Sequence, residues 1–346
     1  MVLRYGAIEK EIFLSSRIPV NFDVERYFNH HEMMNRIRAF EETAATANDD
    51  GLVLGAIHLS IGQEAIASGV CQNLEKDDFL LSTHRGHGHT LAKGADPQTM
   101  MLELLGRKGG ICQGKGGSMH IADFSVGMLG ANGVVSANIN IAAGAGHAIK
   151  LKGGNNISCC IFGDGAINRG PFLEGLNWAG VFKLPVLFVC EKNGFASTTV
   201  TEAMTSGEGG KQRAQSLGIP AEEVDGNDIV EVDECVRQNI KEIRSGGGPR
   251  FILCNTYRLH GHTASDPALY REQKDVDEAW KNDPISKCRD LLKNAGVLDE
   301  DLKGHRTDAL SEMRAIYNRA KQAPWPELQL AYEDVQDSGD PREEAF

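Results

Sequence analysis

The chain has 346 residues, of which 41% are hydrophobic and 24% charged, so it can bury a sizeable core and is not disordered throughout. Asp and Glu total 48 against 36 Lys and Arg, which gives a formal net charge of -12. This balance argues against a general nucleic-acid or anionic-membrane surface, so any anion that the protein binds needs a local site.

The eight cysteines are scattered, form no C-x-x-C pair and in several cases lie inside apolar runs. We therefore expect reduced core thiols and a cytoplasmic location. The first stretch, MVLRYGAIEKEIFLSS, carries charges throughout and lacks an apolar signal core. No run approaches the ~18 apolar residues that a bilayer span requires, so we expect no membrane partner.

The N-terminal third predicts an arm followed by helices and one strand. Residues 1–23 show no clean period, and we expect an arm there. Apolar residues at helical spacing then predict an amphipathic helix over residues 24–48. A second helix is expected near GQEAIASGVCQNL, and the short apolar run FLLST predicts a strand that ends at Thr83.

Residues 106–133 are too glycine-rich for a regular element, and we expect a long functional or disordered loop there. Within it, GGICQGKG fits G-x-x-x-x-G-K but ends in glycine, where a P-loop needs Ser or Thr for magnesium. We therefore reject a P-loop and predict a flexible lid or a partner contact, with Ser118 and His120 near the mouth of an active site.

Three apolar, β-rich runs follow, ISCCIFG, LPVLFVC and RFILCNTY, and helical patterns lie at about 167–183, 208–217 and 228–244. Strands that alternate with helices predict βαβ units. The expected fold class is therefore α/β, with a parallel sheet that has helices on both faces. Residues from about 274 onward indicate helices that close the domain and then an acidic, solvated tail.

A carboxylate stands at the end of the first of these strands, where Asp164 lies between Gly163 and Gly165. Ligands of open parallel sheets bind at this end, and an acidic side chain there repels phosphate unless a cation intervenes. Asn193 ends the next strand, and a right-handed crossover puts it about 5 Å of sheet from Asp164, so the two could share Mg²⁺. Taken singly, G-D-G and Asn193-Gly194 are also common turn formers, and that alternative stays open.

The segment GDGAINRGPFLEGLNWAGVFKLPVLFVCEKNGF resembles the thiamin diphosphate motif, G-D-G followed about thirty residues later by N-N, of the α subunits of 2-oxoacid dehydrogenase E1 components. HLSIGQEAIASGV, STHRGHGHTLAKG and GKGGSMHIAD upstream, and TYRLHGHTASDPALYR downstream, match in the same order over roughly residues 25–290. The resemblance implies the thiamin diphosphate-binding fold. It assigns an arm to residues 1–23, a diphosphate-binding domain to 24–290, and a C-terminal helical extension with an acidic tail to 291–346.

By this resemblance Asp164, Asn193 and the backbone carbonyl of Phe195 bind Mg²⁺. Gly165 and Ala166 are expected against the diphosphate at a helix N-terminus, where unpaired N–H groups favour anions. Phe195 stands where the family commonly has tyrosine, and this departure removes no metal ligand.

The segment THRGHGH matches the family residues that contact the diphosphate, which implicates His84 and Arg85. Two alternatives for its three histidines stay open, a solvated helix start and a zinc site. The resemblance also places the backbones of Gly133 and Val135 against the aminopyrimidine ring. Lys192 replaces the usual first asparagine of N-N and could alter the surroundings of the cofactor.

Two histidines match active-site residues of the family, His58 in AIHLSIGQE and His262 in LHGHTASDP, and we predict them to be catalytic. His262 also lies on a loop that orders over the cofactor in the family. Arg258 matches a phosphate contact of that loop. Thr263 occupies the first position that eukaryotic relatives phosphorylate, but the loop is shorter here, and we predict no kinase control.

The resemblance implies an α subunit that decarboxylates a 2-oxoacid, with pyruvate favoured, and transfers the acyl group to the lipoyl domain of an E2 acyltransferase. An acetoin dehydrogenase E1 α subunit is the alternative, and a non-catalytic cofactor-binding scaffold is a second. The length of 346 residues accommodates one such domain and not the fused pair. We therefore expect an E1 β partner in an α2β2 heterotetramer, with thiamin diphosphate and Mg²⁺ as cofactors.

Overall fold

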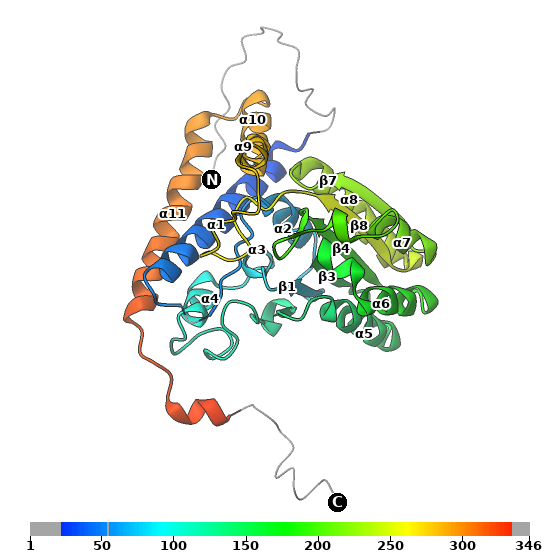
Figure 1. Ribbon diagram of the computed structural model, residues 1–346, viewed down its shortest axis with the longest axis horizontal. Coiled ribbons are helices and arrows are strands. Elements are labelled where there is room, and N and C mark those ends of the chain that lie inside the picture. Colours follow the sequence, from blue (N-terminus) through cyan, green and yellow to red (C-terminus); the bar gives the residue numbers. More distant parts are fainter. Residues whose placement is uncertain (1–21, 54, 334–346) are drawn as a thin grey trace, which may run out of the picture.

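The computed structural model describes residues 22–53 and 55–333, so the predicted N-terminal arm and most of the acidic tail lie outside the described residues. Its fold is α/β, as expected (Figure 1), with six strands in one parallel sheet of order β2-β1-β3-β4-β8-β7. These strands are β1 (Phe79–Thr83), β2 (Met128–Asn132), β3 (Ser158–Gly163), β4 (Val186–Lys192), β7 (Ala221–Asp225) and β8 (Arg250–Asn255). A small antiparallel hairpin follows β4 and pairs β5 (Phe195–Ala196) with β6 (Thr199–Val200).

The α-helices of the described residues surround this sheet. They are α1 (Val24–Asp49), α2 (Glu64–Cys71), α3 (His87–Ala92), α4 (Pro97–Leu104), α5 (Ala137–Lys152), α6 (Gly170–Val181), α7 (Gly210–Ser216), α8 (Ile229–Glu242), α9 (Gln273–Lys281), α10 (Pro284–Asn294) and α11 (Asp299–Gln322).

Both faces of the sheet are covered by these helices, which confirms the predicted layers. Cys159 and Ile161 of β3 pack into a core shared with α1, α2, α3, α4, α8 and α11. Cys160 and Phe162 pack into a second core with α5, α6 and α7. Because successive strand residues point to opposite faces, a strand covered on both sides must be apolar throughout. This is why ISCCIFG forms one unbroken apolar run.

The helix α11 lies along α1, so a C-terminal helix packs against an N-terminal one (Figure 1). Arg36 of α1 pairs with Glu312 at 2.7 Å, and the buried His31 lies 2.9 Å from His305, Nδ1 to Nδ1. No helix among the described residues combines the length and the apolar character needed to cross a bilayer. The eight cysteines are all free, and six of them are buried.

The glycine-rich segment is more regular than predicted. The expectation of no regular element over residues 106–133 is wrong, because β2 pairs with β1 at the edge of the sheet. The segment GGICQGKG is held by a buried carboxylate rather than left as a free lid. Glu103 accepts hydrogen bonds from four backbone N–H groups, those of Cys112, Gly114, Gly116 and Gly117, at 2.7–3.0 Å. A side-chain carboxylate thus takes the place that a phosphate has in a P-loop.

Candidate active site

The C-terminal ends of β1, β3 and β4 open onto a cavity of about 360 Å³, a size suited to a small molecule or cofactor. All of the residues predicted to form the site line this cavity, from segments far apart in the sequence. They are His58, His84, Arg85, Gly133, Val135, Asp164, Gly165, Ala166, Asn193, Phe195, Arg258 and His262. The topology therefore brings the candidates together, while their individual roles stay predictions.

Asp164 and Asn193 follow neighbouring strands, because β3 pairs with β4 and Gly163 lies opposite Glu191. Asp164 Oδ2 accepts a hydrogen bond from the N–H of Gly194 at 3.0 Å, whereas its buried Oδ1 has no partner among the described residues. Burial raises the pKa of Asp164, and the hydrogen bond from Gly194 opposes this rise. A desolvated carboxylate oxygen of this kind fits a bound cation, which would offset its buried charge.

The helix N-terminus expected at Gly165 and Ala166 is that of a short 3-10 helix, Asp164–Asn168, and the α-helix α6 follows only at Gly170. A Cβ on Gly165 would lie 2.8 Å from the Cβ of Ala196, so the hairpin itself demands glycine there. A Cβ on Gly163 would meet no heavy atom within 4 Å, and this backbone lines the cavity directly.

Two buried guanidinium groups line the cavity without a carboxylate hydrogen-bond partner among the described residues. Arg85 donates to the carbonyl oxygens of Leu59 and His262, both at 2.7 Å, and Arg258 donates to the carbonyl of Ser197 at 2.9 Å. Burial, together with the charge of Arg258, lowers the pKa of Arg85 to about 9. Burial and the charge of Arg271 also lower the pKa of Arg258. Two buried cations that destabilise each other provide a site for an anion.

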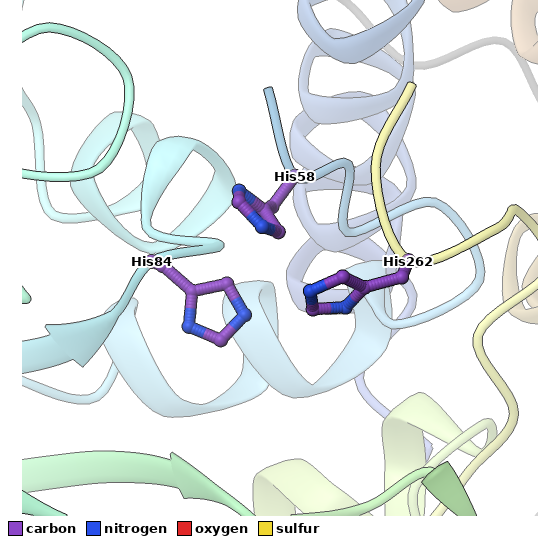
Figure 2. Close-up of side chains that lie close together, drawn as sticks. All are labelled: His58, His84 and His262. Carbon is purple, nitrogen blue, oxygen red and sulfur yellow. The ribbon is translucent and has the colours of Figure 1, made fainter. Parts of the chain in front are cut away.

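Three imidazoles, those of His58, His84 and His262, point toward one another beside these arginines (Figure 2). The ring centroid of His58 lies 4.5 Å from that of His84 and 4.8 Å from that of His262. Burial, followed by the charge of Arg85, lowers the pKa of His58 to about 3 and of His262 to about 4. Both rings are therefore neutral near pH 7, with one N–H donor and one acceptor nitrogen each.

The other two histidines of THRGHGH serve a different purpose. His87 contacts Glu41 at 3.1 Å and Ser118 at 2.9 Å, and His89 contacts Ser82 at 2.7 Å and Glu191 at 3.2 Å. Both histidines are buried. The solvated helix start is therefore wrong for His87 and His89, which are buried, and the three histidines of the segment do not converge on one metal. His84 instead groups with His58 and His262, whose ligand atoms lie within 4.8 Å of one another and could hold a metal ion.

The loop that carries His262 is held by a network that includes a residue not singled out from the sequence. Asp266 accepts from the N–H of His262 at 2.6 Å and from the hydroxyl of Tyr270 at 2.8 Å. Arg258 donates to that same hydroxyl at 3.1 Å. Asp266 lacks a motif signature of its own, and only its three-dimensional contacts show that it holds this loop.

A family model described as "Dehydrogenase E1 component" matches residues 32–329, which include the whole cavity. The chain belongs to this family. Membership implies thiamin diphosphate as the cofactor of the E1 chain, and E1 α subunits generally pair with a β subunit. The arginines and the free carboxylate oxygen of the cavity fit a diphosphate with its cation.

The E1 chain is similar to curated proteins of two kinds. It is 44% identical over 261 residues to the α subunit of acetoin:2,6-dichlorophenolindophenol oxidoreductase of Bacillus subtilis, which covers 73% of this chain and 78% of that protein. The corresponding subunit of Cupriavidus necator is 40% identical over 314 residues, or 90% of this chain and 94% of that protein. The pyruvate dehydrogenase E1 α subunit of Zymomonas mobilis is 36% identical over 315 residues, covering 90% and 89%.

Proposed function

We propose that this E1 chain is the α subunit of an oxidoreductase that cleaves the carbon–carbon bond beside a carbonyl group, with thiamin diphosphate and Mg²⁺ as cofactors. One observation carries the proposal. The cavity combines two buried, carboxylate-free guanidinium groups with a buried carboxylate oxygen that has no partner among the described residues. A diphosphate bridged to a cation offsets all three buried charges at once.

In this proposal Arg85 and Arg258 hold the diphosphate, while Asp164 Oδ1, Asn193 Oδ1 and the carbonyl of Phe195 hold Mg²⁺. Bound thiamin diphosphate supplies a nucleophilic carbon and an electron sink for cleavage beside a carbonyl. The role of the protein is to bind, to orient and to move protons. Gly133 and Val135 line the cavity, and their backbones are available to the aminopyrimidine ring.

His262 is oriented for proton transfer by Arg85. Arg85 Nη2 lies 3.2 Å from His262 Nδ1, and because a guanidinium can only donate, Nδ1 is the acceptor and Nε2 carries the proton. His262 Nε2 is therefore the donor for a substrate oxygen. His58 Nδ1 has no partner among the described residues and can serve as a second proton-transfer atom at the same substrate.

Acetoin and the 2-oxoacids, among them pyruvate and the branched-chain 2-oxoacids, are the candidate substrates, and the comparisons favour acetoin. Acetoin is named in the two relatives with the higher identities, 44% and 40%, whereas pyruvate is named in six relatives at 31–36% identity. We therefore place acetoin ahead of pyruvate as the substrate, which reverses the preference for pyruvate stated from the sequence. The partners proposed are an E1 β subunit in an α2β2 assembly and the lipoyl domain of an E2 acyltransferase.

The test is a comparison of kcat/KM for acetoin, pyruvate and branched-chain 2-oxoacids. The chain is co-expressed with a candidate β subunit and assayed with an artificial electron acceptor, so that E2 is not required. The proposal expects turnover that requires both cofactors, with acetoin preferred. Turnover of pyruvate alone would reverse the substrate assignment, and a complex that binds thiamin diphosphate but turns over no substrate would favour the scaffold alternative.

A further inference from the structure

The amide of Asn193 is held in one orientation by two contacts. The backbone N–H of Phe195 donates to Asn193 Oδ1 at 3.2 Å, and because a backbone N–H can only donate, this atom must be the oxygen. Asn193 Nδ2 therefore faces the other way and donates to Gln63 Oε1 at 3.0 Å. Both side chains are buried, with 4% of Asn193 and 1% of Gln63 exposed. The second lone pair of Asn193 Oδ1 stays available to a cation.

Gln63 occupies a position where a side chain ordinarily caps a helix. It is the N-cap residue of α2, a position where Ser, Thr, Asp or Asn usually accepts from the first turn of the helix. Gln63 makes no such cap, and its longer side chain extends to Asn193 instead. The backbone of Gln63 is fixed on both sides, because its N–H donates to Ser60 and its carbonyl accepts from Ile66.

The next residue anchors this turn to the core. Glu64 Oε2 accepts from the N–H of Gly62 at 3.0 Å, and Glu64 Oε1 pairs with the buried Arg38. Arg38 is bound in turn by Asp283 at 2.7 Å. Gln63 thus stands on a turn that is anchored to the core, and its side chain extends from this turn to bring Oε1 to Asn193, while its Nε2 has no partner among the described residues.

We propose that Gln63 is a positioning residue for the divalent cation, which it serves by keeping Asn193 Oδ1 directed beside Asp164 Oδ1. This inference rests on the proposed function, to which the cation belongs. Without an acceptor at Gln63, the Asn193 amino group is buried and unpaired, and rotation of the amide would turn that group toward the cation. Partners that orient metal ligands typically change metal affinity by about 10–100-fold.

The direct test measures Mn²⁺ in place of Mg²⁺. Free Mn²⁺ is counted by electron paramagnetic resonance in titrations of the α/β assembly with saturating thiamin diphosphate. Gln63→Met removes the acceptor at nearly constant length and is expected to weaken Mn²⁺ binding by about 10–100-fold. Gln63→Glu keeps an oxygen at this position and is expected to bind Mn²⁺ at least as well as the wild-type protein. At saturating Mn²⁺ the KM of Gln63→Met for substrate should match the wild-type value.

The matched control is Asn239→Leu, which removes another buried amide, one that donates to Glu222 on β7 and to the carbonyl of Cys235 on α8. It should leave Mn²⁺ binding unchanged. Wild-type-like Mn²⁺ affinity in Gln63→Met overturns the inference, and so does equal weakening in Asn239→Leu. Should Gln63→Met fail to assemble, Gln63→Asn, which is shorter by one methylene, gives the same decision. If the wild-type assembly itself binds no Mn²⁺ with thiamin diphosphate, the proposed metal site fails and the inference with it.

Discussion

Arg85→Met tests whether a buried guanidinium in the cavity exists to hold an anion. Arg85 is 3% exposed, and its described hydrogen-bond acceptors are the neutral carbonyls of Leu59 and His262 and the imidazole of His262. Its pKa falls from 12.5 to about 9, chiefly through burial. At 1.36 kcal/mol for each pH unit, this corresponds to roughly 5 kcal/mol of unfavourable charge burial in the free protein. The two hydrogen bonds to carbonyl oxygens offset about 1.5–3 kcal/mol each. We therefore expect that removing the side chain leaves the free energy of unfolding nearly unchanged.

The cofactor-free variant should therefore unfold at nearly the wild-type temperature. Binding of thiamin diphosphate should instead weaken about 100-fold or more, because a lost pair of charge-assisted hydrogen bonds costs about 3 kcal/mol or more. Calorimetric titration of the α/β assembly in the presence of Mg²⁺ measures this loss. Arg85→Lys keeps the charge but not the planar fork, so its affinity for thiamin diphosphate should lie between those of the wild-type protein and Arg85→Met. Wild-type affinity in Arg85→Met, or a collapse of its melting temperature, would refute the reasoning.

Three further outcomes follow from the same contacts. Asp164→Ala should abolish Mg²⁺-dependent binding of thiamin diphosphate without lowering the melting temperature, because burial already raises the pKa of this carboxyl; retained binding in equilibrium dialysis would contradict this. The pKa values of His58 and His262 lie below the ordinary value of 6.5 in the folded chain. Below pH 6.5 the unfolded chain therefore binds more protons than the folded chain does, so the free energy of unfolding should fall as pH drops from 6.5 to 4. His58→Gln should flatten that slope in urea titrations, and an unchanged slope would count against a buried neutral imidazole. Glu103→Gln should speed amide deuterium exchange at residues 112–117, because an amino group then faces backbone donors; unaltered exchange would show that the loop is held otherwise.

The central strands and the meeting of Asp164 with Asn193 could be predicted from sequence because their signals are local. A strand covered on both faces is apolar throughout, and a short crossover puts the next strand beside it. The edge strands β2 and β7 carry no such run. MLGAN contains a glycine, and AEEVD is mostly charged and only partly buried. Each segment is therefore a strand because it pairs with a neighbouring strand, and its own residues would not predict it.

The site was predictable where a motif marks a residue and unpredictable where only contacts do. Arg85 and His262 lie 177 positions apart, and nothing in either segment shows that Arg85 fixes the tautomer of His262. Glu103 likewise precedes a glycine-rich loop whose N–H groups face a carboxylate, an arrangement that the P-loop-like spacing alone did not reveal. The roles of Gln63 and Asp266 depend on hydrogen bonds whose partners come from other segments or from a folded loop.

The most direct measurement of the central claim is cofactor-dependent turnover by the purified α/β assembly after both cofactors have been removed. Acetoin or pyruvate is supplied with an artificial electron acceptor, and thiamin diphosphate and Mg²⁺ are returned singly and together. The proposed function predicts activity only when both are present, and none at any concentration in Asp164→Ala. Turnover that persists without either cofactor, or full activity in Asp164→Ala, would contradict it.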